Sequence, residues 1–538
     1  MRITNKVIQN NSISNINSNK VLQDKLNNQM STEKKINRPS DDPIIAIRAL
    51  RLRTNVAQVT QYYEKNIPDA ESWMQITEDS LTTVSDVLTD VIEQCTKGTS
   101  EKLTTTDRQT ILDNIRQLHD EVYATGNADN AGRSVFTGYR TETTLMFTKG
   151  ETKKYSITEQ LHGSDLSTVK YINSRDINNI NEVNFNTAEY NNTVEQNIEE
   201  NEIYRMRLAY SNLDGEAGLI PQISTYDVAT DSYVPFNTAA NTEVISVNDD
   251  PSPYQILADY DKANEEAIAA GNEPVDRYVL IPDTGELLMT KSAYQKLMNL
   301  KDDIMTSATD ESEIQITYQK SIWDKGDLRP EHYFACTDQT EADPAAWVYY
   351  NQDYLRGLKE KQSIEYDVGL NQSIRVNTTA DEVFAHAIGR DVDDMISSMQ
   401  DVVDMEATIE RLKSIRSGYS ENDSEYSVIN NQVDAAEKAL TFLKEKCQKC
   451  FENNITNMQK HLDNVNYATT NCGTREMKLD LVKNRLMSQK TNFETLQSDN
   501  EDVDLTDVAI QLSGAELTYQ AALMSVGKIM QTSLMNYI

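Results

Sequence analysis

Hydrophobic positions recur with spacings of three and four residues in two distant parts of the chain. In the first part these positions are Met74, Thr77, Leu81, Val84, Leu88, Val91 and Cys95. In the second part apolar residues recur at every seventh position, and these are Val465, Cys472, Leu479, Leu486 and Phe493. This spacing is typical of the seam of a left-handed coiled coil. We therefore expect a mainly α fold in which both chain ends build a long antiparallel coiled-coil stem.

Helix boundaries follow from capping residues, glycines and prolines. The first periodic helix is expected to end at Gly98, and a second to begin at Thr106, where Gln109 completes a capping-box pattern, and to end at Gly126. Proline interrupts helices because it lacks the backbone N–H. In the N-terminal stretch we expect such breaks at the three prolines there, Pro39, Pro43 and Pro68.

The middle of the chain has a different pattern. Alternating apolar and polar residues at 154–157 and 313–318, and a turn signal at 282–285, predict strands. Eight of the 11 prolines lie between Pro221 and Pro344. We expect a strand-rich (α+β) insertion of one or two subdomains, carried by the helical stem.

Five segments follow from these patterns. They are an N-terminal amphipathic helix (1–42), the first part of a helical rod domain (43–147), the strand-rich outer insertion (148–383), the second part of the rod domain (384–495) and a C-terminal amphipathic helix (496–538).

The two ends of the chain are amphipathic but weakly helical. Asn and Ser dilute the apolar residues of 1–42, which lowers the intrinsic helix propensity of that segment. In the last segment apolar residues recur at spacings of four and three from Val508 to Ile529. Such segments gain order when a partner covers their apolar stripe. We therefore expect both ends to bind partners.

Charge and composition exclude several classes of partner. The 51 Lys and Arg against 85 Asp and Glu give a formal net charge of −34, and no local basic cluster interrupts it. Phosphate backbones and anionic lipid surfaces repel such a chain, so we expect no nucleic-acid and no membrane partner. No apolar run approaches the roughly 20 residues of a membrane span, and the first forty residues lack the apolar core of a secretory signal.

Candidate chemistry is sparse. Cys447 and Cys450 form a C-x-x-C pair, but both lie at seam positions, where cysteine packs as a small hydrophobe, and no further ligands lie nearby. The carboxylate-rich stretch 499–504 lacks the glycine and closing glutamate of a calcium loop, and we interpret it as a solvated helix start. Nucleotide, hydrolase and zinc-protease motifs are absent from the sequence. We expect no enzyme, no cofactor and no metal.

One short segment suggests a family. Residues 36–43 read INRPSDDP, in which the prolines break a helix while Ser40, Asp41 and Asp42 can cap the next one. This segment resembles the elbow signature of bacterial flagellar hook-associated proteins. Other stretches of that family resemble residues 135–141 (VFTGYRT), the pair 364–369 and 374–377, and residues 502–504 with the helix that ends at 533–538 (SLMNYI). The structural elbow predicted here consists of Arg38, Pro39, Ser40, Asp41, Asp42 and Pro43.

Within the flagellin superfamily, the chain is more similar to the hook-associated protein 3 family, found at the hook–filament junction, than to flagellin. Flagellins usually have N-S-A-x-D-D-A-A-G at the elbow. The resemblance implies a flagellin-like fold and an extracellular structural adaptor, exported unfolded through the flagellar type III system. The implied partners are hook-associated protein 1, flagellin, an export chaperone and further copies of this chain in a ring-like tier.

The terminal helices are the expected assembly interface. The predicted contact residues are Ile3, Val7, Leu22, Leu26, Leu523, Val526, Ile529 and Leu534. Three alternatives stay open at this point. The chain could be a flagellin filament subunit, an adhesin or binding module on a helical stalk, or an enzyme whose site lies hidden in the insertion.

Overall fold

The computed structural model describes residues 5–100, 102–215, 219–227, 230, 232–299, 314–356 and 362–535. Within these, the side chains of residues 5, 164 and 529–535 are not described. The chain divides into two compact units. The first unit comprises Met1–Glu71, Glu365–Ile374 and Arg475–Ile538, and the second comprises Ser72–Ile364 and Arg375–Thr474.

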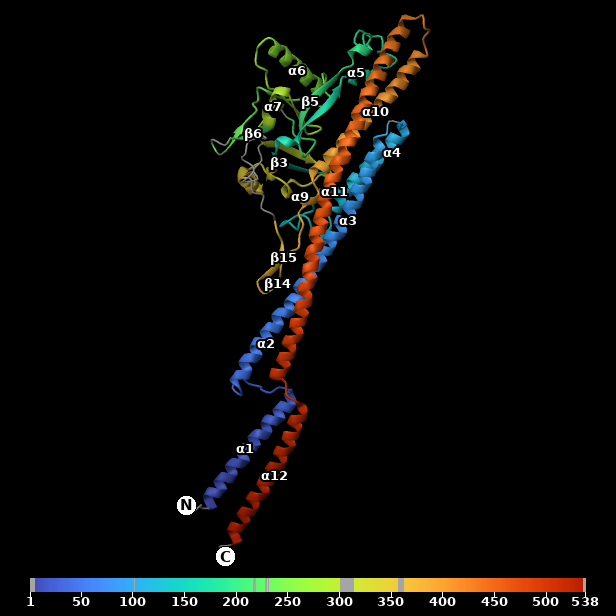
Figure 1. Ribbon diagram of the computed structural model, residues 1–538. Coiled ribbons are helices and arrows are strands. Elements are labelled where there is room, and N and C mark those ends of the chain that lie inside the picture. Colours follow the sequence, from blue (N-terminus) through green and yellow to red (C-terminus); the bar gives the residue numbers. More distant parts are fainter. Residues whose placement is uncertain are drawn as a thin grey trace. The chain divides into compact units, whose positions relative to one another are not determined.

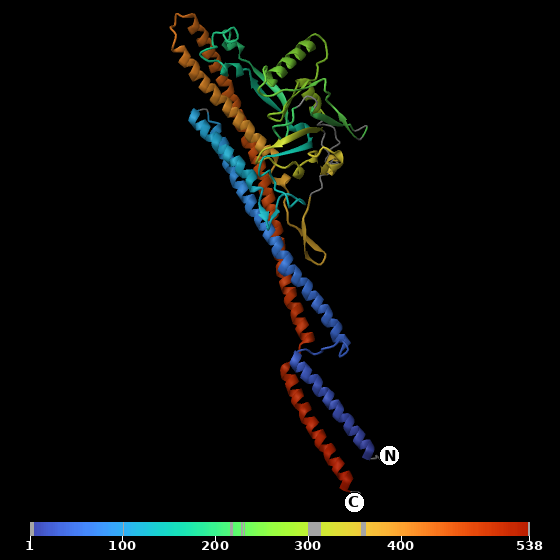
Figure 2. The ribbon, with the colours of Figure 1, turned by 180° about the vertical axis from the view of Figure 1, so that it is seen from behind.

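The first unit is built from helices and one hairpin. In both views α1 and α12 lie side by side, with the two chain ends near each other (Figures 1 and 2). The β14–β15 hairpin contacts the π-helical turn η1, where Asn66 Nδ2 donates to the Asp367 carbonyl at 2.7 Å. The elements are α1 (Asn5–Thr32), α2 (Pro43–Gln61), η1 (Tyr62–Asn66), the start of α3 (Ile67–Gly98), β14 (Glu365–Gly369), β15 (Gln372–Arg375), the end of α11 (Ser424–Glu501) and α12 (Leu505–Met535).

The expected break at Pro68 is wrong. The helix passes from α2 through η1 into α3, and Pro68 is the second residue of α3. The Ile67 N–H donates to the Tyr62 carbonyl, five residues earlier, as in a π-helical turn. This wider turn directly precedes the proline, whose ring crowds the preceding turn and whose missing N–H removes one helical bond. The π turn accommodates the proline without ending the helix.

The helical part of the second unit contains most of α3, α4 (Thr105–Thr125), α10 (His386–Arg416) and most of α11. The seven seam positions predicted between Met74 and Cys95 are all at most 1% exposed. Val465 and Cys472 in this unit are likewise fully buried, as is Leu479 in the part of α11 that belongs to the first unit. Farther along α11, Leu486 is 3% exposed and Phe493 is only partly buried. Cys472 Sγ lies 3.6 Å from the Met74 carbonyl oxygen, so α3 and α11 are direct neighbours there. The sequence periodicity therefore identified the buried faces of both helices.

The start of α4 differs from the prediction by two residues. Thr104, not Thr106, is the N-cap, and its side chain accepts from the Asp107 N–H while Asp107 accepts from the Thr104 N–H. The shorter carboxylate of Asp107 completes the capping box in place of Gln109. The predicted ends of α3 at Gly98 and of α4 at Gly126 are confirmed.

A tyrosine from α4 caps α10. The Tyr123 hydroxyl accepts from the Gly389 N–H and donates to the Ala385 carbonyl, both at 2.9 Å. A Cβ at residue 389 would lie only 3.1 Å from that hydroxyl oxygen. Glycine at 389 therefore allows α4 and α10 to approach closely.

The strand-rich part of the second unit contains two sheets (Figure 1). The six-stranded sheet has the order β13-β12-β3-β11-β6-β7 and is antiparallel throughout. The five-stranded sheet has the order β4-β5-β10-β9-β8, and only its β8–β9 pair is parallel. The predicted strands at 154–157 and 313–318 are confirmed as parts of β3 and β11, with the described residues of β11 beginning at Ile314.

The bounds of these strands are β1 (Asp129–Asn130), β2 (Arg133–Ser134), β3 (Glu151–Leu161), β4 (Leu166–Ile172), β5 (Glu200–Arg207), β6 (Gln222–Asp227), β7 (Ser232–Pro235), β8 (Thr242–Val244), β9 (Tyr278–Ile281), β10 (Glu286–Met289), β11 (Ile314–Trp323), β12 (Ala335–Asp338) and β13 (Val348–Tyr350). The accompanying α-helices are α5 (Arg175–Asn178), α6 (Pro253–Ala269), α7 (Lys291–Asn299) and α9 (Ala380–Val383).

Both sheets contribute to one large apolar core. Trp323, which is 1% exposed, lies at its centre, with the rings of Phe147, Tyr155 and Tyr210 at centroid distances of 4.9, 5.4 and 5.1 Å. Offset-stacked and edge-to-face rings at such distances add to the free energy gained from burial alone. This part of the chain therefore has its own source of stability.

A buried ion-pair network joins the five-stranded sheet to α10. Arg205 on β5 pairs with Glu286 on β10 and contacts Asp394 on α10 at 2.5 Å, while Arg207 contacts Asp394 at 2.9 Å and Asp391 at 2.6 Å. Burial acts to raise the pKa of Asp394, but Arg205 and Arg207 outweigh it and hold that pKa below its usual range. Asp394 is therefore charged, and its pairs with Arg205 and Arg207 bind the sheet to α10.

A second buried carboxyl lies inside the sheet core. Glu159 on β3 is 3% exposed, and one of its oxygens accepts from the Ala209 N–H at 2.8 Å and from the Tyr318 hydroxyl. Burial raises the pKa of Glu159 to about 7, although both hydrogen bonds act in the opposite direction. This side chain therefore titrates near neutral pH.

None of the five cysteines forms a disulfide, and burial raises the pKa of Cys447 to about 12 and of Cys450 to about 11. Thiols in this state react slowly, because the thiolate is the nucleophile and the metal ligand. Over the described ranges no group of three or more His, Cys, Asp and Glu is arranged to hold a metal ion. In the same part of the chain no helix has the length and apolar character required to span a bilayer.

Candidate assembly interface

Over the described side chains of α1 and α12, which exclude residues 5 and 529–535, the pairing of the two helices buries few residues. The buried members of their shared cluster are Leu26, Val508 and Ala515, with Val503 and Leu512 packed partly against them. Both helices are several turns longer than this contact requires. Each helix therefore keeps much of its apolar surface exposed.

The predicted contact residues fall into three groups. Val7, Leu22 and Leu523 are 47%, 46% and 45% exposed. Val526 is partly buried, and Leu26 is 3% exposed within the α1–α12 cluster. Ile3 lies outside the described residues, as do the side chains of Ile529 and Leu534.

A second apolar row on α12 was not among the predicted contacts. Ile510, Leu517 and Met524 are 66%, 69% and 66% exposed. Their seven-residue spacing places them on one face, about 180° around the helix from Val508 and Ala515. The seven-residue spacing of this row can be found in the sequence. The apolar row identified from the sequence is the other one of the same segment, which begins at Val508 and faces α1. Two apolar rows on opposite faces give α12 the means to contact two helices at once.

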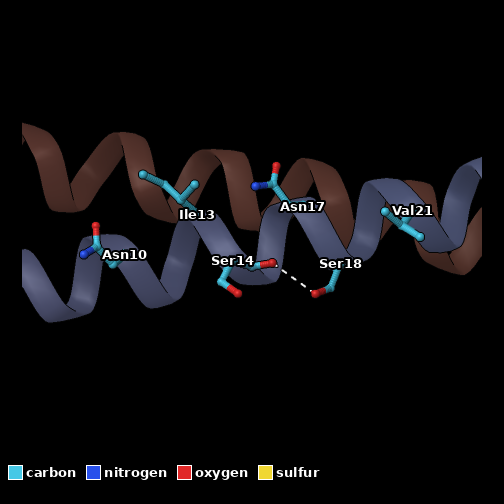
Figure 3. Close-up of a pocket in the computed structure, with 6 residues that line it drawn as sticks. All are labelled: Asn10, Ile13, Ser14, Asn17, Ser18 and Val21. Carbon is cyan, nitrogen blue, oxygen red and sulfur yellow. Dashed lines mark hydrogen bonds between the residues drawn. The ribbon is translucent and has the colours of Figure 1, made fainter.

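The exposed face of α1 carries a shallow groove (Figure 3). Ser18 Oγ donates to the Ser14 carbonyl at 3.1 Å, so this hydroxyl is satisfied within the helix. Small side chains alternating with β-branched ones suit the close approach of another helix. None of the lining residues is ionisable. Its lining is Asn10, Ile13, Ser14, Asn17, Ser18 and Val21.

At the elbow, two connectors run beside each other. One joins α1 to α2, and the other, residues 502–504, joins α11 to α12. The Lys35 N–H donates to the Glu501 carbonyl at 2.7 Å, and the Val503 N–H donates to the Glu33 carbonyl at 3.1 Å. Lys34 and Asp502 form an isolated antiparallel β-bridge between the same two connectors.

The predicted elbow residues form a turn followed by a helix cap. The Asp41 carboxylate accepts from the Asn37 and Arg38 N–H groups at 3.2 and 2.9 Å, and its own N–H donates to the Arg38 carbonyl, which closes a turn over Pro39 and Ser40. Asp42 is the N-cap of α2 and accepts from the Ile44 and Ile45 N–H groups, with Pro43 at the first helical position.

The interpretation of 499–504 as a solvated helix start is wrong for its first three residues. Residues 499–501 end α11, and the Glu501 side chain is only 3% exposed. Asp504 does begin a helix, because its carboxylate accepts from the Thr506 and Asp507 N–H groups at 2.9 and 3.3 Å. These bonds hold the pKa of Asp504 below its usual range.

An ion pair that the sequence did not reveal holds the elbow from the side. Arg53 on α2 meets Glu501 with two bonds, Nε to Oε1 at 2.8 Å and Nη2 to Oε2 at 2.5 Å. The residues are 448 positions apart, so no local pattern connects them. The hydrogen bond and charge of Glu501 raise the pKa of Arg53.

One comparison with known proteins falls on the region that contains the elbow. Residues 3–141 match the family model described as the bacterial flagellin N-terminal helical region. This stretch contains α1, the elbow and α2 to α4. It ends at residue 141, six residues before the end of the predicted first part of the rod domain (43–147).

Two relatives carry one name. Flagellar hook-associated protein 3 of Salmonella typhimurium is 30% identical over 143 residues, which is 26% of this chain and 45% of the relative. The protein of the same name from Escherichia coli is 33% identical over 120 residues, 22% of this chain and 38% of the relative. This chain therefore spans less than half the length of each of these relatives. The resemblance inferred from the sequence is confirmed over these stretches.

Solved structures with similar names show only a distant likeness. The flagellar hook-associated protein 3 of Legionella pneumophila is 9% identical and covers 83% of this chain and 97% of its own, with a TM-score of 0.28. A flagellar junction protein from the same organism is 8% identical and covers 85% and 100%, with a TM-score of 0.27. At these scores the likeness does not establish a shared fold.

Proposed function

We propose that this chain is a structural component of the bacterial flagellum, an adaptor of the hook-associated protein 3 type that joins the hook to the flagellin filament. Its resemblance to proteins of that name over about a quarter of the chain, and the match of residues 3–141 to the flagellin N-terminal family model, support the proposal. In this role the chain lies outside the cell, after export by the flagellar type III system with the help of an export chaperone. It would contact hook-associated protein 1 on one side and flagellin on the other.

The observation that carries this proposal is the apolar row of Ile510, Leu517 and Met524 on α12. Each of these side chains is about two-thirds exposed, although a large apolar side chain gains roughly 1.5–3 kcal/mol when it is fully buried. A row with heptad spacing on one side of a helix fits another helix. Assembly that covers this row would therefore stabilise the terminal pair.

Assembly in this scheme proceeds through α1 and α12 as an antiparallel coiled-coil pair. The exposed Val7, Leu22 and Leu523 join the exposed row of α12 in facing partner helices. Val526 is partly buried on the face of α12 that holds Val508, and it contributes next to α1. Ile3, Ile529 and Leu534 extend the contact. Leu26 supports the interface from inside, because it holds α1 on α12. Further copies of the chain supply some of these partner helices in a ring-like tier.

Immunogold electron microscopy of intact flagella, with an antibody against the strand-rich insertion, tests the location. We expect one cluster of gold where the hook meets the filament. Gold along the whole filament would identify a filament subunit, and gold on the cell body alone would favour an adhesin on a helical stalk. A strain lacking the gene supplies the background.

A matched pair of variants tests the interface. Leu517→Ser removes an exposed apolar side chain from α12, whereas Thr518→Ser alters the next residue, which is also exposed, by a single methyl group. We expect the first variant to be secreted but missing from flagella, and the second to be incorporated normally. Normal incorporation of Leu517→Ser combined with Ile510→Ser would contradict the proposed interface.

A further inference from the structure

We infer that Arg53 and Glu501 are the positioning residues of a lock at the elbow, which ties both connectors together so that α1 and α12 are directed as one body. The lock joins residues from opposite ends of the chain. The conformational part of this inference does not depend on the proposed function, and only its consequence for assembly does.

The backbone supplies the first element of the lock. The connector after α11 consists of residues 502–504. One backbone hydrogen bond runs from Val503 in this connector to Glu33, and a second runs from Lys35 to Glu501 at the end of α11. Glu33 reaches this position with a φ of 59°, a left-handed conformation that non-glycine residues adopt rarely. Surrounding contacts must maintain such a conformation.

Glu501 supplies the second element, and its position is unfavourable without a cation. It is the last residue of α11, where the partial negative charge of the helix end disfavours a carboxylate. Its side chain is also 3% exposed, so water cannot solvate the charge. The position is stable only because Arg53 forms two bonds to the carboxylate, with Lys34 Nζ at 3.8 Å from Oε2.

Three further contacts extend the lock to every element at the elbow. Lys34 pairs with Asp502, which holds the pKa of that carboxyl below its usual range. Lys35 Nζ donates to the Asp499 carbonyl, and Asn500 Nδ2 donates to the Ile45 carbonyl at 3.2 Å. The end of α11 is thus bonded to both α2 and the first connector.

The geometry predicts unequal effects of the two single substitutions. Arg53→Met leaves a buried carboxylate without its main partner, which is the costly way to break an ion pair. Glu501→Gln leaves a neutral amide that still accepts a hydrogen bond from Arg53. In the Glu501→Gln background no buried carboxylate is present, so the further change Arg53→Met removes little additional stability. The double variant should therefore resemble Glu501→Gln.

Hydrogen exchange of the full chain, followed by mass spectrometry on peptides covering 30–42 and 496–508, tests the lock. We expect Arg53→Met to accelerate exchange in both peptides by about tenfold or more, Glu501→Gln by less, and the double variant by no more than Arg53→Met. Unchanged exchange in β11 confirms folding. The control is Lys97→Met, which breaks the exposed Lys97–Glu93 pair on α3 and should leave the elbow unchanged.

Two results would overturn the lock. One is exchange in the elbow peptides that does not respond to Arg53→Met, and the other is a double variant whose effect equals the sum of the single effects. If the exchange results hold but gold labels no hook–filament junction, the proposed function fails while the lock stands. If gold labels the junction and the elbow peptides of Arg53→Met exchange at the parent rate, the lock fails while the proposed function stands.

Discussion

The α1–α12 pair and the strand-rich insertion keep their folds by different means. The insertion surrounds Trp323 with a large two-sheet core and binds its sheet to α10 through buried ion pairs. Among the side chains that the structure describes, the buried members of the α1–α12 cluster are Leu26, Val508 and Ala515. The first region is stable through its own contacts, and the second has exposed apolar rows in place of a core.

The difference indicates where each region obtains its free energy. Ordering a residue costs about 1–2 kcal/mol of backbone entropy, and buried apolar surface must offset that cost. The insertion gains this offset inside its own chain. The α1–α12 pair gains the full free energy of apolar burial only when other helices cover its exposed rows. This dependence suits a segment that becomes ordered during assembly.

The largest expected effect comes from the buried ion-pair network of the insertion. Arg205→Met removes the arginine partner of the buried Glu286 and one of the two arginines that contact the partly exposed Asp394, so we expect the five-stranded sheet to lose about 3–5 kcal/mol of opening free energy. Hydrogen exchange of peptides covering β5 and β10 measures this loss. Exchange at α1 and α12 should stay unchanged.

The matched control for Arg205 is Lys170→Met on the neighbouring strand β4. Lys170 pairs with Glu200 at 2.6 Å, but both side chains are partly exposed, so its loss should cost below about 1 kcal/mol. Equal effects of the two substitutions would show that burial does not distinguish these pairs.

A smaller effect is expected at Glu159, and it depends on pH. Folding raises the pKa of this carboxyl from 4.5 to about 7, so the folded state holds the proton more tightly. Its contribution to stability is therefore complete below pH 4.5 and is lost as the pH rises through 7. At pH 9 we expect Glu159→Gln to stabilise the insertion by on the order of 2–3 kcal/mol, and at pH 4 by almost nothing.

Urea denaturation followed by tryptophan fluorescence at pH 4, 7 and 9 measures this dependence, because Trp323 lies in the same core. Glu151→Gln on the same strand is the control, since that side chain is not buried. A stability difference between Glu159→Gln and the parent chain that is constant with pH would contradict the assigned titration.

The smallest expected effect on the isolated chain comes from the exposed row of α12. Ile510→Ser and Leu517→Ser should each change the opening free energy of α12, measured by hydrogen exchange, by less than about 0.5 kcal/mol, because these side chains contact solvent. Leu26→Ala, at a buried position, should cost about 2 kcal/mol or more. If the exposed and buried substitutions cost the same in the monomer, the row of α12 would already be covered within the chain.

Much of the fold could be predicted from local patterns. The seven-residue period gave the buried faces of α3 and α11, because helix geometry alone fixes which positions share a face. Alternation gave β3 and β11, and the turn and cap at Asp41 and Asp42 followed from short-range hydrogen bonding. The π turn before Pro68 was missed, because a helix can widen locally and so tolerate a residue that usually ends it.

By itself, the sequence determined the periodic helices, the alternating strands, the elbow turn and the resemblance to flagellar proteins, since each depends on residues close together in the chain. Only the tertiary structure decided which distant charges meet, as in Arg53 with Glu501 and Arg205 with Asp394. It also decided which of the two apolar rows of α12 faces α1 and which stays exposed. Such pairings depend on how whole elements pack, and no local spacing encodes that choice.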